Sequence, residues 1–219
     1  MPNPFFLSFL YPFYTSGKTE RVGIEVRGRS RNLRVNYRTT DEIRRWACAQ
    51  LEGCPIDDLD GDMASLKGYR SLTHGSPPEI LPSASAAEDI EHIHNILRQM
   101  TEDGMAHQQA CITARTNKDL ETYITALRHQ GIASLKLDRD TADDQKFAGV
   151  RLATMHRIKG IEFSVVVLAG YKSPHAYAET FARDEDAGVT EETETAERCL
   201  LHVAATRARE HLYILQRLR

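Results

Sequence analysis

The sequence has 219 residues, of which 41% are hydrophobic, and this is enough to bury one sizeable core. Its formal charge of −3 at pH 7 excludes a uniformly basic, nucleic-acid-coating surface, so any such contact must come from a local basic patch. No stretch approaches the ~18 apolar residues that a membrane-spanning helix needs, and the four widely spaced cysteines include no CxxC pair. We therefore expect a protein of the reducing cytoplasm, without a membrane partner, a disulfide framework or a structural zinc.

Residues 1–32 are expected to form a partly irregular N-terminal extension. Its aromatic opening is interrupted by prolines and lacks the basic region and the small-residue cleavage site of a signal peptide. The GKT at 17–19 suggests a phosphate-binding loop, but Pro12 stands where that loop needs a glycine, and no apolar strand leads into it. The extension therefore predicts neither a signal peptide nor a phosphate-binding loop.

An extended segment and a helix follow the extension. The segment ends near Arg38, and Thr39 or Thr40 then begins a helix that runs to about Leu51. Glu42 is placed for a capping box at the start of this helix. The sequence therefore predicts a strand-to-helix turn at this point.

Tyr37 and Arg38 lie at that turn. Considered alone, an exposed tyrosine beside an arginine favours a surface cation–π contact. Residues 52–82 are rich in Gly, Asp, Ser and Pro and predict a long irregular connection. The aspartates at 57–62 lack the closing glutamate of an EF-hand, so they predict a solvated turn instead of a calcium site.

Alternating helices and strands occupy the middle of the chain. A helix is predicted from about Ser85 to Met100, a strand at 110–114, a helix from Asn117 to about His129, and a strand near 133–137. Gly131 suits the end of the second of these helices, because glycine readily adopts the left-handed conformation found there.

The most apolar stretch of the chain is VRLATMHRIKGIEFSVVVLAG, at 150–170. It predicts a short strand that ends at Thr154 and a second strand from Phe163 to Ala169. A continuously apolar strand of this kind is typical of the centre of a parallel sheet that has helices on both faces.

A polar segment separates these two strands. It contains His156, Lys159, Gly160 and Glu162, and we expect it at the carboxyl edge of the sheet. Ligands of α/β proteins bind at this edge, because backbone groups and side chains converge there without disturbing the core. These four residues are therefore the first candidates for a site.

The last part of the chain predicts an acidic loop, a helix and a strand. Residues 179–197 are strongly acidic and predict a solvated, flexible loop. A helix is predicted from about Thr195 to Arg209, with Arg207 near the end where the helix dipole favours positive charge, and a strand at 211–215. Because helices and strands alternate throughout, the chain predicts an α/β fold with a parallel sheet.

Four segments, in this order, resemble the second motor domain of superfamily 1 DNA helicases of the UvrD/Rep/PcrA type. They are LRVNYRTTDEI (33–43), ACITARTNKDLETYITALRHQGI (110–132), VRLATMHRIKGIEFSVVVLAG (150–170) and ETAERCLLHVAATRAREHLYIL (194–215). The resemblance implies that residues 33–219 form a RecA-like domain, a parallel sheet flanked by helices as in P-loop NTPases but without the P-loop itself.

The resemblance also implies roles at a site for ATP. Tyr37 would stack on the adenine, Arg38 would reach the γ-phosphate, and Arg207 would be the arginine finger. Glu162 would hydrogen-bond the ribose, with Lys159 and Gly160 shaping that side of the site. Arg207 and Arg38 would therefore be the catalytic groups that this chain supplies.

By the same resemblance, a second set of residues would contact single-stranded DNA. These residues are Arg115, Thr116, Asn117, Thr154 and His156. In this family the contacts are made mostly to the DNA backbone, which suits a motor that steps along any sequence.

Several parts of the family's ATP site have no counterpart in this sequence. There is no phosphate-binding loop, no Asp-Glu pair to hold Mg²⁺, and no glutamine before the first arginine motif. All of these belong to the family's first RecA-like domain, which would be supplied in a longer chain or in trans. We therefore expect this polypeptide alone to be inactive as an ATPase.

The function implied by the resemblance is that of the C-terminal half of an ATP-dependent 3′→5′ DNA helicase or translocase. The family's large accessory domain is also missing, because only residues 138–149 stand in its place. The alternative is a non-catalytic module, derived from a helicase half, that binds nucleic acid or protein.

Overall fold

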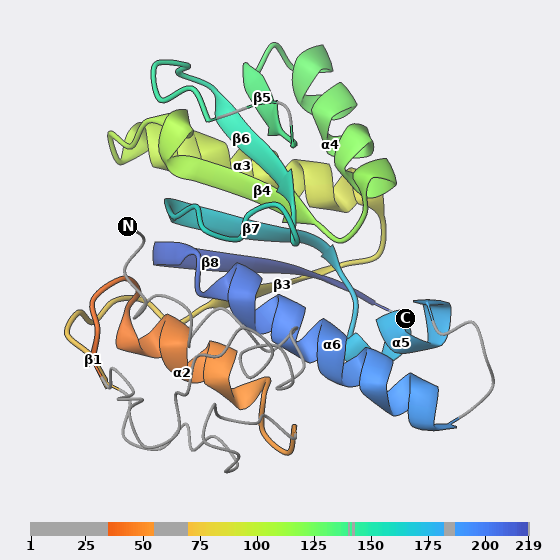
Figure 1. Ribbon diagram of the computed structural model, residues 1–219. Helices are drawn as coiled ribbons and strands as arrows, with labels where there is room; N and C mark the ends of the chain where they lie inside the picture. Colours follow the sequence, from red (N-terminus) through yellow and green to blue (C-terminus); the bar gives the residue numbers. More distant parts are fainter. Residues whose placement is uncertain (1–34, 55–69, 140, 142, 182–186, 219) are drawn as a thin grey trace.

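A six-stranded sheet forms the centre of this structure, a computed structural model that describes residues 35–54, 70–139, 141, 143–181 and 187–218. From one edge to the other, the strands are β3 (Glu79–Ser83), β8 (Ala208–Arg217), β7 (Phe163–Tyr171), β4 (Ala110–Ala114), β6 (Val150–Thr154) and β5 (Ser134–Leu137). Every neighbouring pair is parallel, so all six carboxyl ends lie at one edge of the sheet (Figure 1). The predicted α/β fold with a parallel sheet is confirmed.

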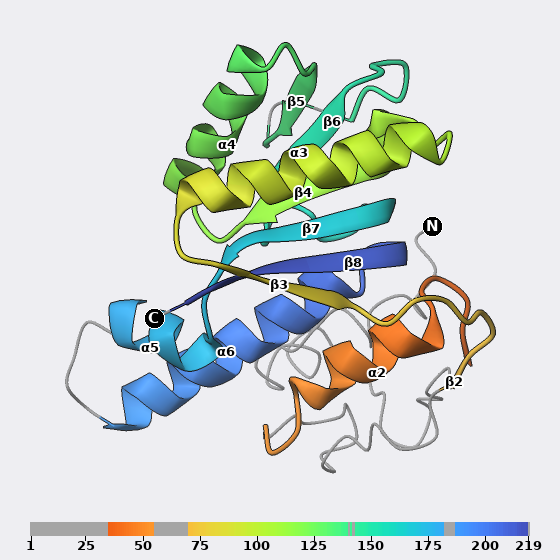
Figure 2. The ribbon, with the colours of Figure 1, turned by 180° about the vertical axis from the view of Figure 1, so that it is seen from behind.

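Helices cover both faces of the sheet (Figures 1 and 2). One face is covered by α3 (Ala86–Glu102) and α4 (Asn117–His129), and the other by α2 (Asp41–Ala49) and α6 (Ala187–Ala205), with α5 (Pro174–Phe181) packed against α6. On β7, Val165 and Val167 pack toward α3 and α4, whereas Val166 and Leu168 pack toward α2 and α6. Because both of its faces are covered, β7 is apolar almost throughout.

Side-chain oxygens begin three of the helices. The hydroxyls of Thr40, Ser85 and Thr116 each accept a hydrogen bond from a backbone N–H in the first turn of α2, α3 and α4. The predicted capping box at Glu42 is wrong, since Thr40 is the cap and the Glu42 carboxylate instead accepts a hydrogen bond of 2.9 Å from Gly75 N. That bond ties the start of α2 to a segment far along the chain.

The predicted irregular connection at 52–82 contains two strands. β2 (Arg70–Ser71) pairs with β1 (Val35–Asn36) in a separate parallel pair, and β3 forms an edge of the main sheet. The prediction is wrong for these residues, because β3 is short and contains Pro82, which hides its strand character. The Pro82 carbonyl accepts a hydrogen bond of 3.1 Å from His92 on α3. The aspartates at 57–62 lie outside the described residues.

The prediction of a flexible acidic loop is wrong for residues 187–197, which form the first half of α6. Their acids are compatible with a helix because some are paired: Glu194 lies 2.7 Å from Arg198 and 3.0 Å from His175. Residues 182–186 of the predicted loop, and the whole predicted extension at 1–32 with its GKT segment, lie outside the described residues.

The short connection between β5 and β6 surrounds the buried side chain of Arg151 and is hydrogen-bonded to it. Its guanidinium pairs with Asp143 at 2.9 Å and donates to the carbonyls of Asp144, Phe147 and Gly149 at 2.6 to 2.7 Å. These bonds satisfy a buried charge with partners from within the connection itself.

In the described part of the chain, no helix is long and apolar enough to cross a bilayer.

A buried polar cluster joins the carboxyl ends of β3 and β8 to the helices α3 and α4. The fully buried Asp89 accepts a hydrogen bond of 2.6 Å from the Tyr123 hydroxyl and forms an ion pair with Arg217. Arg217 also donates to the Ser83 hydroxyl at 2.9 Å. Four elements therefore depend on one carboxylate.

Replacing Asp89 with alanine would leave the Arg217 guanidinium and the Tyr123 hydroxyl without their buried partner. We expect Asp89→Ala to lower the free energy of unfolding by about 3–5 kcal/mol, measured by urea denaturation. The exposed Glu91 on the same helix provides the control, and Glu91→Ala should stay within about 0.5 kcal/mol of the wild type. Equal effects of the two substitutions would contradict the role of the cluster.

His202 of α6 should make stability depend on pH. Its Nδ1 donates to the Ala47 carbonyl of α2 at 3.0 Å, and burial lowers its pKa below the ordinary 6.5. The unfolded chain therefore binds more protons just below pH 6.5, so the stabilisation is present above that pH and lost as the pH falls through it. We expect urea denaturation to show this loss, with a limiting slope of about 1.4 kcal/mol per pH unit, and His202→Gln to reduce it.

Candidate functional site

Three segments that are distant in sequence meet at the amino ends of β7 and β8. Glu162 directly precedes β7, and Arg207 directly precedes β8. Phe163 lies opposite Ala208 in the parallel register, and Phe163 N donates to the Arg207 carbonyl at 3.0 Å. Glu162 and Arg207 are therefore neighbours at the amino edge of the sheet.

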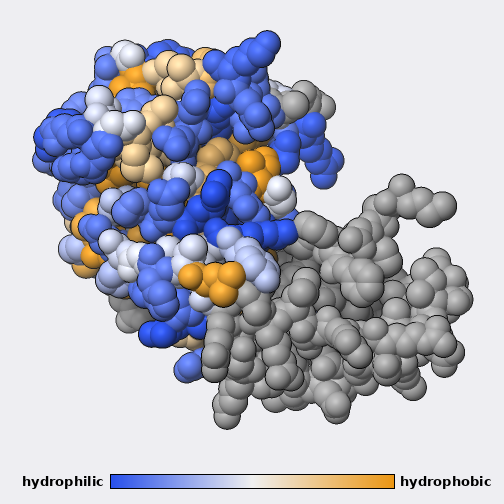
Figure 3. Space-filling model, turned by 90° about the vertical axis from the view of Figure 1, so that its left-hand side faces the viewer, coloured by the Kyte–Doolittle hydropathy of each residue, from blue (hydrophilic) through white to orange (hydrophobic). Residues whose placement is uncertain are grey.

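Arg38 reaches the same edge from the turn before α2. Its Nε lies 3.2 Å from a carboxylate oxygen of Glu162, in a partly exposed pair. Such a pair contributes little to stability, but it fixes where the guanidinium lies. The neighbouring side chain, Tyr37, is 70% exposed, which leaves most of its aromatic ring open to solvent. Figure 3 views the molecule from the side on which the amino ends of β7 and β8 lie, and most of the described surface in that view is hydrophilic.

Arg207 carries a buried charge at this edge. Its Nε donates to the Val203 carbonyl at 3.1 Å and its Nη2 donates to the Thr206 hydroxyl at 3.3 Å, which anchors it on the end of α6. Within the described residues, no carboxylate forms an ion pair with Arg207. Burial lowers the pKa of its guanidinium, the Glu162 charge raises it, and the Arg38 charge lowers it.

Arg38, Arg207 and Glu162 together carry one net positive charge. A buried guanidinium without a carboxylate partner is costly, and an anionic ligand would compensate it. Planar guanidinium groups also match the geometry of phosphate oxygens. The arrangement is therefore suited to a phosphate-bearing ligand.

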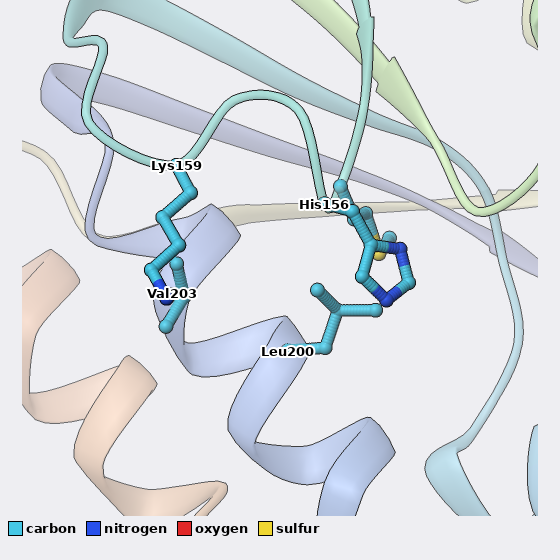
Figure 4. A pocket seen from close by; sticks show the side chains of 5 residues that line it. His156, Lys159, Leu200 and Val203 are labelled. Atoms are coloured by element: carbon cyan, nitrogen blue, oxygen red, sulfur yellow. The ribbon is translucent and has the colours of Figure 1, made fainter. Parts of the chain in front are cut away.

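The crossover from β6 to β7, residues 155–162, forms a pocket of about 330 Å³ against α6. Figure 4 shows His156 above Leu200 and Lys159 directed toward Val203. The pocket is lined by Met155, His156, Lys159, Leu200 and Val203. Gly160 has a φ of +90°, a left-handed conformation that favours glycine over residues with a side chain.

Five predicted site residues lie at the opposite, carboxyl edge of the sheet. β4 and β6 are neighbours, with Ala114 opposite Thr154. Arg115, Thr116 and Asn117 follow β4, whereas Thr154 ends β6 and His156 comes shortly after it. The structure therefore brings these five residues to one edge, as expected from the sequence.

The expectation that the whole polar segment lies at the carboxyl edge is wrong. Both β6 and β7 are parallel strands, so the chain must return from the carboxyl end of β6 to the amino end of β7. Residues 155–162 make this return without a helix. His156 consequently stays at the carboxyl edge, while Glu162 lies at the amino edge.

Arg115 is held by a residue that sequence reasoning did not identify. Its Nε and Nη2 donate to the Glu197 carboxylate of α6 at 2.7 and 2.6 Å, and the side chains are only 17% and 7% exposed. Burial and the Arg115 charge lower the pKa of the neighbouring His156, and the Glu197 charge opposes them. His156 is therefore mainly neutral at pH 7.

Two of the five residues at the carboxyl edge have local structural roles. The Thr116 hydroxyl accepts a hydrogen bond from Asp119 N at 3.1 Å, and the Thr154 hydroxyl accepts one from Arg157 N at 3.3 Å.

Among the described residues, no group of three or more His, Cys, Asp or Glu side chains converges as a metal site would require.

Comparison with known proteins finds similarity to DNA helicases. Residues 131–218 match the family model of the UvrD-like helicase C-terminal domain. The ATP-dependent DNA helicase PcrA of Staphylococcus epidermidis is 30% identical over 168 residues, which cover 75% of this chain and 20% of PcrA. The helicase-like protein YjcD of Bacillus subtilis is 34% identical over 106 residues, covering 47% and 12%.

A solved structure shares the fold. The C-terminal domain of a DNA-helicase-like protein from Lactobacillus plantarum aligns with a TM-score of 0.56 at 16% identity, over 83% of this chain and 88% of that one. The chain spans about a fifth of the length of the PcrA relatives that it matches. Residues 131–218 thus match the UvrD-like helicase C-terminal domain family, the helicase relatives are similar in sequence, and the solved structure shares the fold of the chain.

Proposed function

We propose that this chain is the second motor half of an ATP-dependent DNA helicase or translocase that moves 3′→5′ along single-stranded DNA. It acts with a first RecA-like domain, in a longer chain or in trans. The observation that carries the proposal is the excess positive charge that Arg38 and Arg207 create around Glu162 at the amino edge. Phosphates of a nucleotide held on the partner domain would compensate that charge.

The proposed nucleotide site uses each group at the amino edge for one task. The exposed ring of Tyr37 stacks on the adenine, and Glu162 hydrogen-bonds the ribose. Arg38 and Arg207 reach the phosphates, where a desolvated guanidinium stabilises the charge that develops on the transferring phosphoryl group. Lys159 and Gly160 shape the adjoining crossover.

Magnesium enters this proposal through the partner domain. The residues that the structure describes include no group of three or more His, Cys, Asp or Glu side chains that could hold a metal ion, and the net positive charge of Arg38, Arg207 and Glu162 would repel one. The chain therefore supplies guanidinium groups to a composite site, and ATP turnover by the chain alone is not expected.

The carboxyl edge is the proposed binding surface for single-stranded DNA. Arg115, Thr116, Asn117, Thr154 and His156 surround the ends of two neighbouring strands there. A neutral imidazole and the backbone N–H groups at the start of α4 can contact a DNA strand without reading its sequence. Nucleotide and DNA would thus occupy opposite edges of one sheet.

The direct test is to mix the chain with the first motor domain of a UvrD-type helicase and to measure DNA-stimulated ATP hydrolysis. Turnover that requires both polypeptides supports the proposal. DNA binding without any turnover would instead favour a non-catalytic module derived from a helicase half.

In that mixture, Arg207→Ala should lower ATP turnover on the order of a thousandfold while DNA binding persists, because the charge on the transferring phosphoryl group loses its guanidinium partner. Arg209→Ala removes an exposed arginine two residues further along and should leave turnover unchanged. Near-normal turnover by Arg207→Ala, measured by phosphate release, would remove Arg207 from the proposed catalytic role.

His156→Ala should weaken binding of an oligo-dT strand by about 1–3 kcal/mol, the cost of losing one polar contact in a groove of this kind. Fluorescence anisotropy of a labelled strand measures this affinity. His94→Ala is the matched control and should bind normally. It removes an exposed histidine of α3, on the face of the sheet opposite α6. Identical affinities of the two variants would exclude His156 from the DNA site.

A further inference from the structure

The pair between Arg115 and Glu197 has a geometry that constrains what Arg115 can do. The two residues are 82 positions apart, on the β4–α4 turn and on α6. Two N–H groups of one guanidinium edge donate to the two carboxylate oxygens at 2.7 and 2.6 Å. A two-point contact of this kind fixes the orientation of both side chains as well as their separation.

The pair is too buried to open readily toward a DNA phosphate. The exposed fractions are 17% for Arg115 and 7% for Glu197, and removing Arg115 would leave the buried Glu197 carboxylate without its guanidinium partner. As a unit the pair also carries no net charge, so it adds little long-range attraction for DNA. Arg115 is therefore better suited to holding the turn in place than to binding the strand.

The turn that Arg115 anchors carries two other candidate DNA contacts. Thr116 caps α4, and Asn117 is the first residue of that helix. The position of Arg115 therefore fixes the position of the backbone N–H groups in the first turn of α4. Glu197 lies about one turn before Leu200, which lines the pocket beneath His156 (Figure 4). The clamp therefore joins the start of α4, α6 and the His156 segment.

We propose that Glu197 is a positioning residue for single-stranded DNA: by clamping Arg115 it holds the start of α4 beside His156 on one continuous surface. This inference rests on the proposed role of the carboxyl edge in DNA binding. Arg115 then contributes to DNA binding indirectly, by fixing the positions of Thr116 and Asn117.

The substitution that tests the clamp is Glu197→Gln, which keeps the size of the side chain and removes its charge. In the 219-residue chain, oligo-dT affinity by fluorescence anisotropy should fall about tenfold, as expected for one lost charge-assisted hydrogen bond. Arg115→Gln and the double variant should show similar losses, because each breaks the same clamp. Additive losses would mean that Arg115 contacts DNA independently.

Glu194→Gln is the matched control. It makes the same chemical change on α6, but Glu194 pairs with Arg198 and His175 outside the clamp. Its DNA affinity should equal that of the wild type. Glu197→Gln should also remain folded by circular dichroism and urea denaturation under the binding conditions, and an affinity loss that tracks only unfolding would overturn the proposal.

A second measurement needs no DNA. The carboxylate of Glu197 and the guanidinium of Arg115 act on the His156 imidazole with opposite signs. Lys159 is the cationic side chain that lines the pocket together with His156. NMR titration should therefore show the pKa of His156 falling in Glu197→Gln and rising in Arg115→Gln, with the signal assigned from His156→Ala. A His156 pKa that responds to neither change would show that the clamp does not form in solution.

These experiments distinguish a failure of the proposed DNA-binding function from a failure of the positioning role of Glu197. A wild-type chain that does not bind oligo-dT refutes the proposed DNA-binding function and this proposal with it. A wild-type chain that binds, together with a Glu197→Gln variant that binds equally well, refutes the positioning role alone. Tighter binding by Glu197→Gln would also refute it, because Glu197 would then compete with DNA for Arg115.

Discussion

The parallel pairing of β7 with β8 determines where charge appears in this molecule. β7 is buried on both faces almost throughout, so polar side chains that serve a ligand must lie beyond its ends. The register of β7 with β8 sets Glu162 beside Arg207, and Phe163 N bonds the Arg207 carbonyl at 3.0 Å. Arg38 completes the group through its pair with Glu162. The proposed phosphate-binding arrangement thus follows from the alignment of two neighbouring strands.

α6 connects this group to the opposite edge of the sheet. Its last turn anchors the Arg207 guanidinium through Val203, while Glu197, about 9 Å earlier along the helix axis, clamps Arg115. Between them, His202 bonds the Ala47 carbonyl of α2. One helix therefore sets the positions of both proposed binding surfaces, and a displacement of α6 along its axis would move both surfaces together.

The local pattern of apolar residues and helix caps was sufficient to predict many helices and strands. It was not sufficient to predict the path of the crossover from the end of one parallel strand to the start of the next. β4 and α4 match their predicted bounds, because apolar spacing and a threonine cap are local signals. β3 was missed because Pro82 interrupts a short strand whose order depends on β8. Glu197 could not be singled out within an acidic run, since its burial depends on a guanidinium 82 residues earlier. The assignment of Glu162 to the wrong edge has the same origin: spacing does not specify the path of a crossover.

The proline in β3 also has a consequence for the open side of the sheet. The Pro82 carbonyl is directed away from β8 and is already bonded by His92, and proline has no N–H to offer a further strand. An incoming strand would therefore find neither a free acceptor nor a donor at this position. At Pro82 the edge therefore disfavours intermolecular strand addition, the usual beginning of β-aggregation.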